Sequence, residues 1–139
     1  MTKPTQEQLK ELVNLYQSGK LDEAENTAQN LLKEFPNDLT CLNILGVVLD
    51  GKGQTEEAIK IYQKALQIND NSPETHFNMG SILHRLGRSN EARISYEKAI
   101  GIKPDFINAH FNLGLVYQNL QDNTKAIESY EKAIELKPD

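Results

Sequence analysis

Apolar residues recur at helical spacing in short segments along the whole chain. The first such stripe begins at Leu9 and ends near Ser18, where polar residues interrupt the pattern. A second stripe runs from Asp22 to Phe35 and stops at Pro36. Apolar positions three and four residues apart lie on one face of an α-helix, so each stripe predicts one amphipathic helix.

A step of 34 residues relates these helices to the rest of the chain. The five residues from His76 to Gly80 return, with one change, from His110 to Gly114, and Gly46 lies one step before Gly80. Glycine inside a helix costs about 1 kcal/mol relative to alanine. Its repetition at one place therefore indicates that a partner helix approaches closely there. Internal repetition of this period is typical of a solenoid.

The 34-residue step divides the chain into four repeats, at residues 5–38, 39–72, 73–106 and 107–139. Each repeat contains two apolar stripes, which predicts about eight helices in a single domain of residues 1–139. Alanines also recur on this step at two places in the repeat, and small residues there predict close contact between the two helices. These residues are Ala24, Ala58, Ala92, Ala126, Ala65, Ala99 and Ala133.

Small polar residues stand at equivalent places before the second helices. Thr55, Ser89 and Asn123 are predicted N-caps, because side chains of these types accept a hydrogen bond from the free amides of a helix start. Pro73 is predicted to open its helix at the first position, where no amide is needed. Gln121 stands where a turn glycine is expected.

The two terminal repeats depart from the pattern in different ways. In the first repeat, Leu12 replaces the glycine and Ala28 replaces an aromatic residue, which we interpret as an N-terminal cap. The fourth repeat has no polar closing helix after it, so Tyr130, Ala133 and Ile134 would lack the neighbour that their counterparts have. We interpret the chain as a fragment cut at a repeat boundary from a longer protein.

Composition narrows the classes of function. A net charge of -5 and a pI near 5.2 argue against nucleic acid as a partner, since such binding needs clustered Lys and Arg. No signal peptide or membrane-spanning stretch is evident, and the single Cys41 cannot form an internal disulfide, so a reduced, cytoplasmic setting is expected. No cluster has metal-ligand spacing and no nucleophile motif occurs. We therefore expect no cofactor, no metal and no catalysis within these residues.

The recurring residues resemble the tetratricopeptide repeat family over nearly the whole chain. The fourth repeat matches the family pattern at His110, Leu113, Gly114, Tyr117, Ala126, Tyr130, Ala133 and Pro138. The repeats look like those of bacterial members and of the repeat domains of O-linked N-acetylglucosamine transferases. The resemblance implies an all-α fold, a right-handed α-solenoid of stacked antiparallel helix pairs. It also implies a scaffold that binds an extended peptide or protein in a concave groove lined by the first helices.

Carrying the family's groove places onto this sequence gives ten predicted peptide contacts. They are Asn43, Phe77, Asn78, Ser81, Arg85, Asn108, Phe111, Asn112, Leu115 and Asn119. Asn78 and Asn112 are the sharpest candidates, because an amide both donates and accepts hydrogen bonds and can satisfy a peptide main chain. The alternative is that these amides only bond neighbouring helices. Phe77 and Phe111 offer flat anchoring surfaces, or else pack sideways between first helices.

Other interpretations remain open for the histidines and for the function. His76 and His110 occupy a packing place, so structural roles are predicted for both rather than metal binding or acid-base chemistry. The repeats can also serve as the substrate-recruiting N-terminal region of a larger transferase. A third alternative is self-assembly into a homo-oligomer, in which the uncapped C-terminal repeat of one protein molecule is buried by another.

Overall fold

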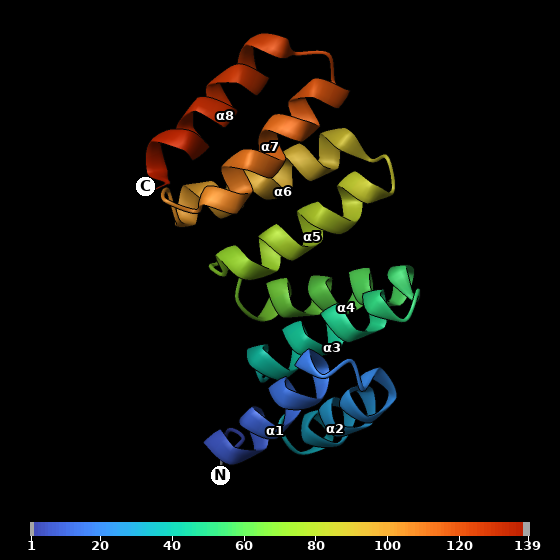
Figure 1. Ribbon diagram of the computed structural model, residues 1–139. Helices are drawn as coiled ribbons and strands as arrows, with labels where there is room; N and C mark the ends of the chain where they lie inside the picture. The colour runs from blue at the N-terminus through green and yellow to red at the C-terminus, as the bar shows by residue number, and fades with distance from the viewer. Residues whose placement is uncertain (1, 138–139) are drawn as a thin grey trace. The chain divides into compact units, whose positions relative to one another are not determined.

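The computed structural model describes residues 2–137, and every regular element in this range is an α-helix (Figure 1). The eight helices are α1 (Gln6–Gln17), α2 (Leu21–Glu34), α3 (Leu39–Gly51), α4 (Thr55–Ile68), α5 (Pro73–Arg85), α6 (Ser89–Ile102), α7 (Ile107–Asn119) and α8 (Asn123–Leu136). The all-α prediction is thus confirmed for the described range. Pro138, a predicted marker of the last repeat, lies outside it.

The chain forms two compact modules, Met1–Asp70 with α1 to α4 and Asn71–Asp139 with α5 to α8. Within each module, consecutive helices joined by short turns pack as antiparallel pairs (Figure 1). The first helices of adjacent repeats also touch, α1 against α3 and α5 against α7. The repeat boundaries and the single domain of residues 1–139 stay predictions.

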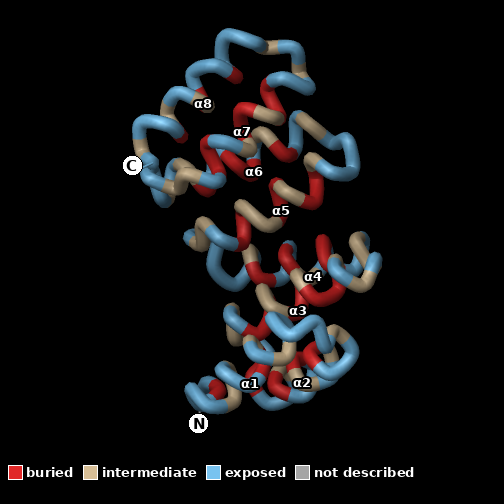
Figure 2. Tube along the Cα trace, in the orientation of Figure 1, coloured by how far each residue is buried: buried red, intermediate tan, exposed pale blue. Residues whose placement is uncertain are grey.

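The core of each helix pair forms where small residues were predicted. Figure 2 shows buried segments recurring on every helix, separated by exposed turns. The repeated alanines are all buried, at Ala24, Ala58, Ala65, Ala92, Ala99, Ala126 and Ala133. A methyl side chain fills little space, so the two helix backbones can approach closely, and the predicted role of the repeated alanines is confirmed.

The repeated helical glycine receives an aromatic ring from the second helix of its own repeat. A Cβ built on Gly80 would lie 2.9 Å from Cε1 of Tyr96, closer than carbon atoms normally approach. The corresponding distance is 2.5 Å in two further pairs, Gly46 with Tyr62 and Gly114 with Tyr130. The glycine thus makes room for a tyrosine ring as well as for a helix backbone.

The first repeat solves the same packing problem with the sizes exchanged. Leu12 stands at the glycine place of α1 and Ala28 at the tyrosine place of α2, and both are 0% exposed. In this repeat the larger side chain of the two therefore belongs to the first helix, whereas in the other repeats it belongs to the second. This exchange keeps the pair filled without a tyrosine.

The turn inside each repeat has one conformation. The Gly53 N–H donates to the Asp50 carbonyl over 2.9 Å, and the Gln54 N–H donates to the Leu49 carbonyl over 2.9 Å. This pair of bonds is the Schellman ending of a helix, which needs a left-handed residue at its centre. The central residues have positive φ in all four repeats, 76° at Gly19, 84° at Gly53, 79° at Gly87 and 61° at Gln121.

These turns correct the predicted caps of the second helices. Thr55, Ser89 and Asn123 are the first residues inside α4, α6 and α8, and the N-cap is the residue before each of them. The prediction was wrong by one position because the last residue of the Schellman turn is also the cap of the next helix. Asp122 caps α8 with its side chain, accepting from the Lys125 N–H over 3.2 Å. Pro73 opens α5, as predicted.

Candidate functional site

A series of hydrogen bonds joins α5, α6 and α7 in the C-terminal module. Asn112 Nδ2 on α7 donates to Tyr96 Oη over 3.3 Å, and Tyr96 Oη donates to Ser81 Oγ on α5 over 3.1 Å. Tyr96 is 1% exposed, whereas Ser81 and Asn112 are half-buried. The buried tyrosine of the second helix therefore reaches two predicted peptide contacts, one on each first helix.

The protonation of Tyr96 fixes the direction of these bonds. Burial raises the pKa of Tyr96, and its hydrogen bonds with Ser81 and Asn112 oppose that rise. The phenol therefore keeps its proton at neutral pH and donates it to Ser81. Among the described residues, the hydroxyl proton of Ser81 and the Oδ1 atom of Asn112 have no further partner.

The next repeat lacks this arrangement. Leu115 stands where Ser81 stands one repeat earlier, and leucine has no side-chain atom that accepts a hydrogen bond. The Tyr130 hydroxyl instead donates to Oε1 of Gln118. The linked set of Ser81, Tyr96 and Asn112 is therefore particular to the third and fourth repeats within the C-terminal module.

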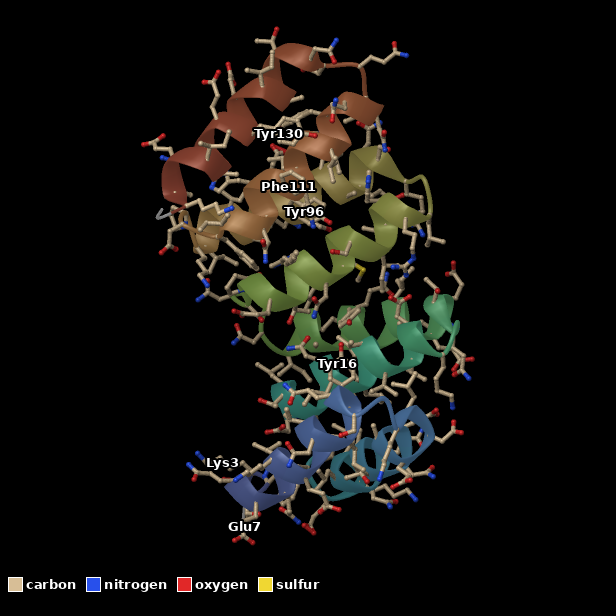
Figure 3. The ribbon with its side chains drawn as sticks, viewed as in Figure 1. Lys3, Glu7, Tyr16, Tyr96, Phe111 and Tyr130 are labelled. Carbon is tan, nitrogen blue, oxygen red and sulfur yellow. The ribbon has the colours of Figure 1, made fainter. Side chains whose placement is uncertain are left out.

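The two phenylalanines have different surroundings. Phe77 is half-buried, with its ring centroid 4.9 Å from that of Phe106 in an edge-to-face contact and 5.7 Å from that of Tyr96. Phe111 is 50% exposed and touches Tyr130 at a centroid distance of 5.5 Å (Figure 3). Phe77 thus packs sideways, as one interpretation had it, while Phe111 keeps half of its surface accessible. Ligand contact stays a prediction for both.

A further contact brings α5 and α7 together near the C-terminal ends of both helices. Asn119 Nδ2 lies 3.4 Å from Nδ1 of His84. The amide nitrogen can only donate, so Nδ1 of His84 accepts this bond. Asn119 is exposed and His84 is half-buried. The accessible polar residues of the two first helices therefore adjoin at two points along their length.

The remaining predicted contacts are also accessible. Asn78 and Leu115 are half-buried, and Arg85 and Asn108 are exposed. These four belong to α5 and α7 in the C-terminal module, whereas Asn43 is half-buried on α3 in the N-terminal module. The sequence placed all ten contacts in one groove. The described contacts bring Ser81 together with Asn112, and Asn119 together with His84.

An open apolar hollow of about 1070 Å³ lies against α7 and α8. Its apolar lining includes Phe106, Phe111, Tyr130, Ala133 and Ile134, and Lys103, Asp105 and Lys137 add charge. Ile134 is 73% exposed, in line with its predicted lack of a neighbour. Ala133 is 7% exposed, against 0% for its counterparts Ala65 and Ala99, and most of its small side chain is covered within its own helix pair.

The surface of α1 has the opposite character. A shallow hollow of about 410 Å³ there is lined by Glu7, Lys10, Glu11 and Asn14 on α1 and by residues that follow it. Charged and amide side chains are costly to bury without partners. The surface of α1 therefore differs in character from the apolar hollow against α7 and α8.

The histidine and cysteine side chains take structural places. His110 is 8% exposed and its Nε2–H donates to the Pro104 carbonyl over 2.8 Å, and His76 is 5% exposed. The predicted packing role is confirmed for both. Burial and the neighbouring Asp38 raise the pKa of Cys41 to about 12, so its thiol stays protonated. Within residues 2–137, no group of three or more His, Cys, Asp or Glu is placed to hold a metal ion.

Comparison with protein families identifies the class of protein. A family model described as TPR repeat matches residues 51–87 and 80–121, and one described as tetratricopeptide repeat matches residues 107–139. The chain therefore belongs to the tetratricopeptide repeat (TPR) family, and its predicted class, an all-α solenoid, is confirmed. It is a protein-interaction scaffold. In the described part of the chain, no helix is long and apolar enough to cross a membrane.

Solved structures share this fold. A crystal structure of MamA is 30% identical over 90% of this chain and 73% of MamA, with a TM-score of 0.82. A second MamA crystal structure is 25% identical over 93% of this chain and 70% of its own, with a TM-score of 0.83. YrrB, described as a TPR protein with an unusual peptide-binding site, is 26% identical over 90% of this chain and 64% of YrrB, with a TM-score of 0.78.

Proposed function

We propose that the accessible faces of α5 and α7 bind an extended peptide or an extended segment of a partner protein. The observation that carries this proposal is the pair of polar links between the two helices, Ser81 to Asn112 through Tyr96 and Asn119 to His84. These links bring hydroxyl and amide groups together on one accessible surface. Such groups both donate and accept hydrogen bonds.

The chemistry of this surface favours an extended ligand over a helical one. An extended segment has main-chain N–H and C=O groups that still need partners, whereas a helix satisfies its own. The half-exposed ring of Phe111 adds an apolar contact of a type enriched among binding hot spots. YrrB, similar in fold and 26% identical, is described as having an unusual peptide-binding site, which supports a peptide as the ligand class.

The test uses a randomised library of twelve-residue peptides. The best binder selected by the wild-type protein is synthesised with a fluorescent label, and its dissociation constant is measured by anisotropy. We expect Phe111→Ala to weaken binding about tenfold or more, the effect of losing a hot-spot side chain. The matched control is Ile94→Ala on α6, which truncates a side chain of similar exposure, 45% against 50%, on a second helix.

Two results would overturn this function. One is a library from which the wild-type protein selects no binder. The other is a selected peptide whose affinity falls as much with Ile94→Ala as with Phe111→Ala, because that peptide would not depend on the first helices. Both variants change exposed side chains, so their melting curves should remain close to that of the wild-type protein.

We propose self-association as a second function, supported by the apolar hollow against α7 and α8. Exposed apolar patches of this kind mark interaction surfaces. The hollow carries both Lys103 and Asp105, so two copies related by a twofold axis can pair opposite charges across an isologous contact. The polar surface of α1 makes a poor partner for the hollow, so the contact joins two equivalent C-terminal ends.

Sedimentation analysis over a range of concentrations tests self-association. The two exposed isoleucines of α8 provide a matched pair, Ile134 in the hollow at 73% exposure and Ile127 outside it at 55%. We expect Ile134→Glu to abolish dimers and Ile127→Glu to leave them. A wild-type protein that stays monomeric at high concentration would disprove this function.

A further inference from the structure

We propose that Tyr96 is a positioning residue, which holds Ser81 and Asn112 as a donor–acceptor pair for the main chain of an extended peptide. This inference rests on the proposed peptide-binding function and assigns its central polar contact. The ligand group is defined by chemistry: a backbone N–H that donates to Asn112 and a backbone carbonyl that accepts from Ser81. Recognition at this pair is therefore independent of the peptide's side chains.

The hydrogen bonds of Tyr96 determine which atoms remain for the ligand. Nδ2 of Asn112 is held on Tyr96 Oη at 3.3 Å, which restrains rotation of the amide and leaves its Oδ1 as an oriented acceptor. Tyr96 donates its only proton to Ser81 at 3.1 Å, so the Ser81 hydroxyl must donate elsewhere. One end of the linked set thus offers an acceptor and the other end offers a donor.

The spacing of the pair suits an extended backbone. Ser81 Oγ and Asn112 Nδ2 are both bonded to Tyr96 Oη, at 3.1 and 3.3 Å, so these two atoms are at most about 6.4 Å apart, and the accepting Oδ1 of Asn112 belongs to the same amide group as Nδ2. An extended peptide advances about 3.3 Å per residue. The pair therefore matches main-chain N–H and C=O groups that lie within about two to three residues of each other.

Tyr96 can act as a fixed support because several contacts hold its side chain in one position. Its ring lies against Gly80, where a Cβ would be 2.9 Å away, and contacts the ring of Phe77 at 5.7 Å. The side chain is 1% exposed, so it does not itself meet a ligand. Its hydroxyl alone links the core to the accessible surface.

The test is a double-mutant cycle on the affinity for the library-selected twelve-residue peptide. Tyr96→Phe keeps the ring on Gly80 and removes both hydrogen bonds, so we expect affinity to fall about threefold to tenfold, the effect of one or two neutral hydrogen bonds. Asn112→Ala should weaken binding to a similar degree. In the Asn112→Ala background, Tyr96→Phe should reduce the affinity for the peptide clearly less than it does in the wild-type protein, because the effects of substitutions at coupled residues do not add.

Tyr130→Phe is the matched control. It removes the tyrosine hydroxyl one repeat later, where that hydroxyl is bonded to Gln118 and, among the described residues, accepts no hydrogen bond from an asparagine. This variant should bind the peptide as the wild-type protein does. Thermal unfolding of all variants separates positioning from structural loss, and the Tyr96→Phe protein should stay folded, with its midpoint lowered by less than about 10 °C.

The outcomes distinguish this inference from the function on which it rests. If the peptide binds and Phe111→Ala weakens it, yet Tyr96→Phe binds as tightly as the wild-type protein, the positioning role is wrong and the function stands. Equal losses from Tyr96→Phe in the presence and absence of Asn112 would also overturn it. If no peptide is selected, the function and the positioning role both fail.

Discussion

The ring of Tyr96 occupies the space in which a side chain on Gly80 would have to lie. A Cβ on Gly80 would be 2.9 Å from Cε1 of the ring and 3.0 Å from Cδ1. Tyr96 is 1% exposed, with its hydroxyl bonded to Ser81 and Asn112, so the ring has little freedom to move. The glycine place and the tyrosine place of one repeat therefore depend on each other.

Gly80→Ala is expected to destabilise the protein. Overpacking costs about 1–3 kcal/mol, and the better helix propensity of alanine returns about 1 kcal/mol, so the free energy of unfolding should fall by up to about 2 kcal/mol. Gly101 on α6 is the control, because a Cβ there would meet nothing within 4 Å. Gly101→Ala should raise the free energy of unfolding by about 0.5–1 kcal/mol. Urea denaturation measures both, and equal shifts of the same sign would contradict the packing argument.

The exchanged sizes of Leu12 and Ala28 predict strong coupling between these two positions. Leu12→Gly removes a buried side chain and adds a flexible residue, at a cost of about 3–6 kcal/mol. Ala28→Tyr alone overpacks α2 against Leu12 and should also destabilise. The double substitution recreates the glycine and tyrosine of the other repeats, so it should be more stable than the sum of the single effects predicts. A double-mutant cycle in urea measures the coupling, and strict additivity would show that the two places do not compensate.

The repeat architecture was predictable because small residues recur along the chain with the period of the repeat. Gly46, Gly80 and Gly114 mark the close approach without any knowledge of the ring that fills it. The sequence could not show which groups meet across different helices, since Ser81 and Asn112 are joined only through Tyr96. The recurring tyrosine of the second helix was nevertheless a sequence signal for such a contact. A buried tyrosine hydroxyl normally finds a hydrogen-bond partner.

One error in the helix caps and one choice that the sequence left open have local physical causes. The cap residues were placed one position too late, because the end of the Schellman turn at Gln54 doubles as the start of α4. The sideways packing of Phe77 was one of two interpretations, and its partner Phe106 lies at the edge of a repeat, where a 34-residue ruler carries no packing information. Contacts between repeats depend on tertiary geometry that a periodic pattern does not specify.

The left-handed backbone conformation of Gln121 predicts that glycine at this position stabilises the protein. Its φ of 61° lies in the left-handed region, where a residue other than glycine is strained by about 1–2 kcal/mol. Gln121→Gly should relieve that strain at some cost in backbone entropy and raise the free energy of unfolding by about 0.5–1 kcal/mol. Gly87 has the same place and a φ of 79°, so Gly87→Gln should produce a loss of similar size. Thermal melts of the two variants that shift in the same direction would refute this explanation.

The raised pKa of Cys41 predicts that the folded protein loses stability in mildly alkaline solution. Burial, helped by the Asp38 carboxylate beside the Cys41 amide, raises its pKa from 9.0 to about 12. The unfolded protein releases this proton first, so the thiol's contribution is complete below pH 9 and is lost as pH rises from 9 towards 12. The free energy of unfolding should therefore fall between about pH 9 and 10 with a slope of at most about 1.4 kcal/mol per pH unit. Cys41→Ala should flatten that slope in urea titrations, and a thiol reagent should modify the folded protein only as fast as it opens. An unchanged slope in the variant would assign the alkaline loss to other groups.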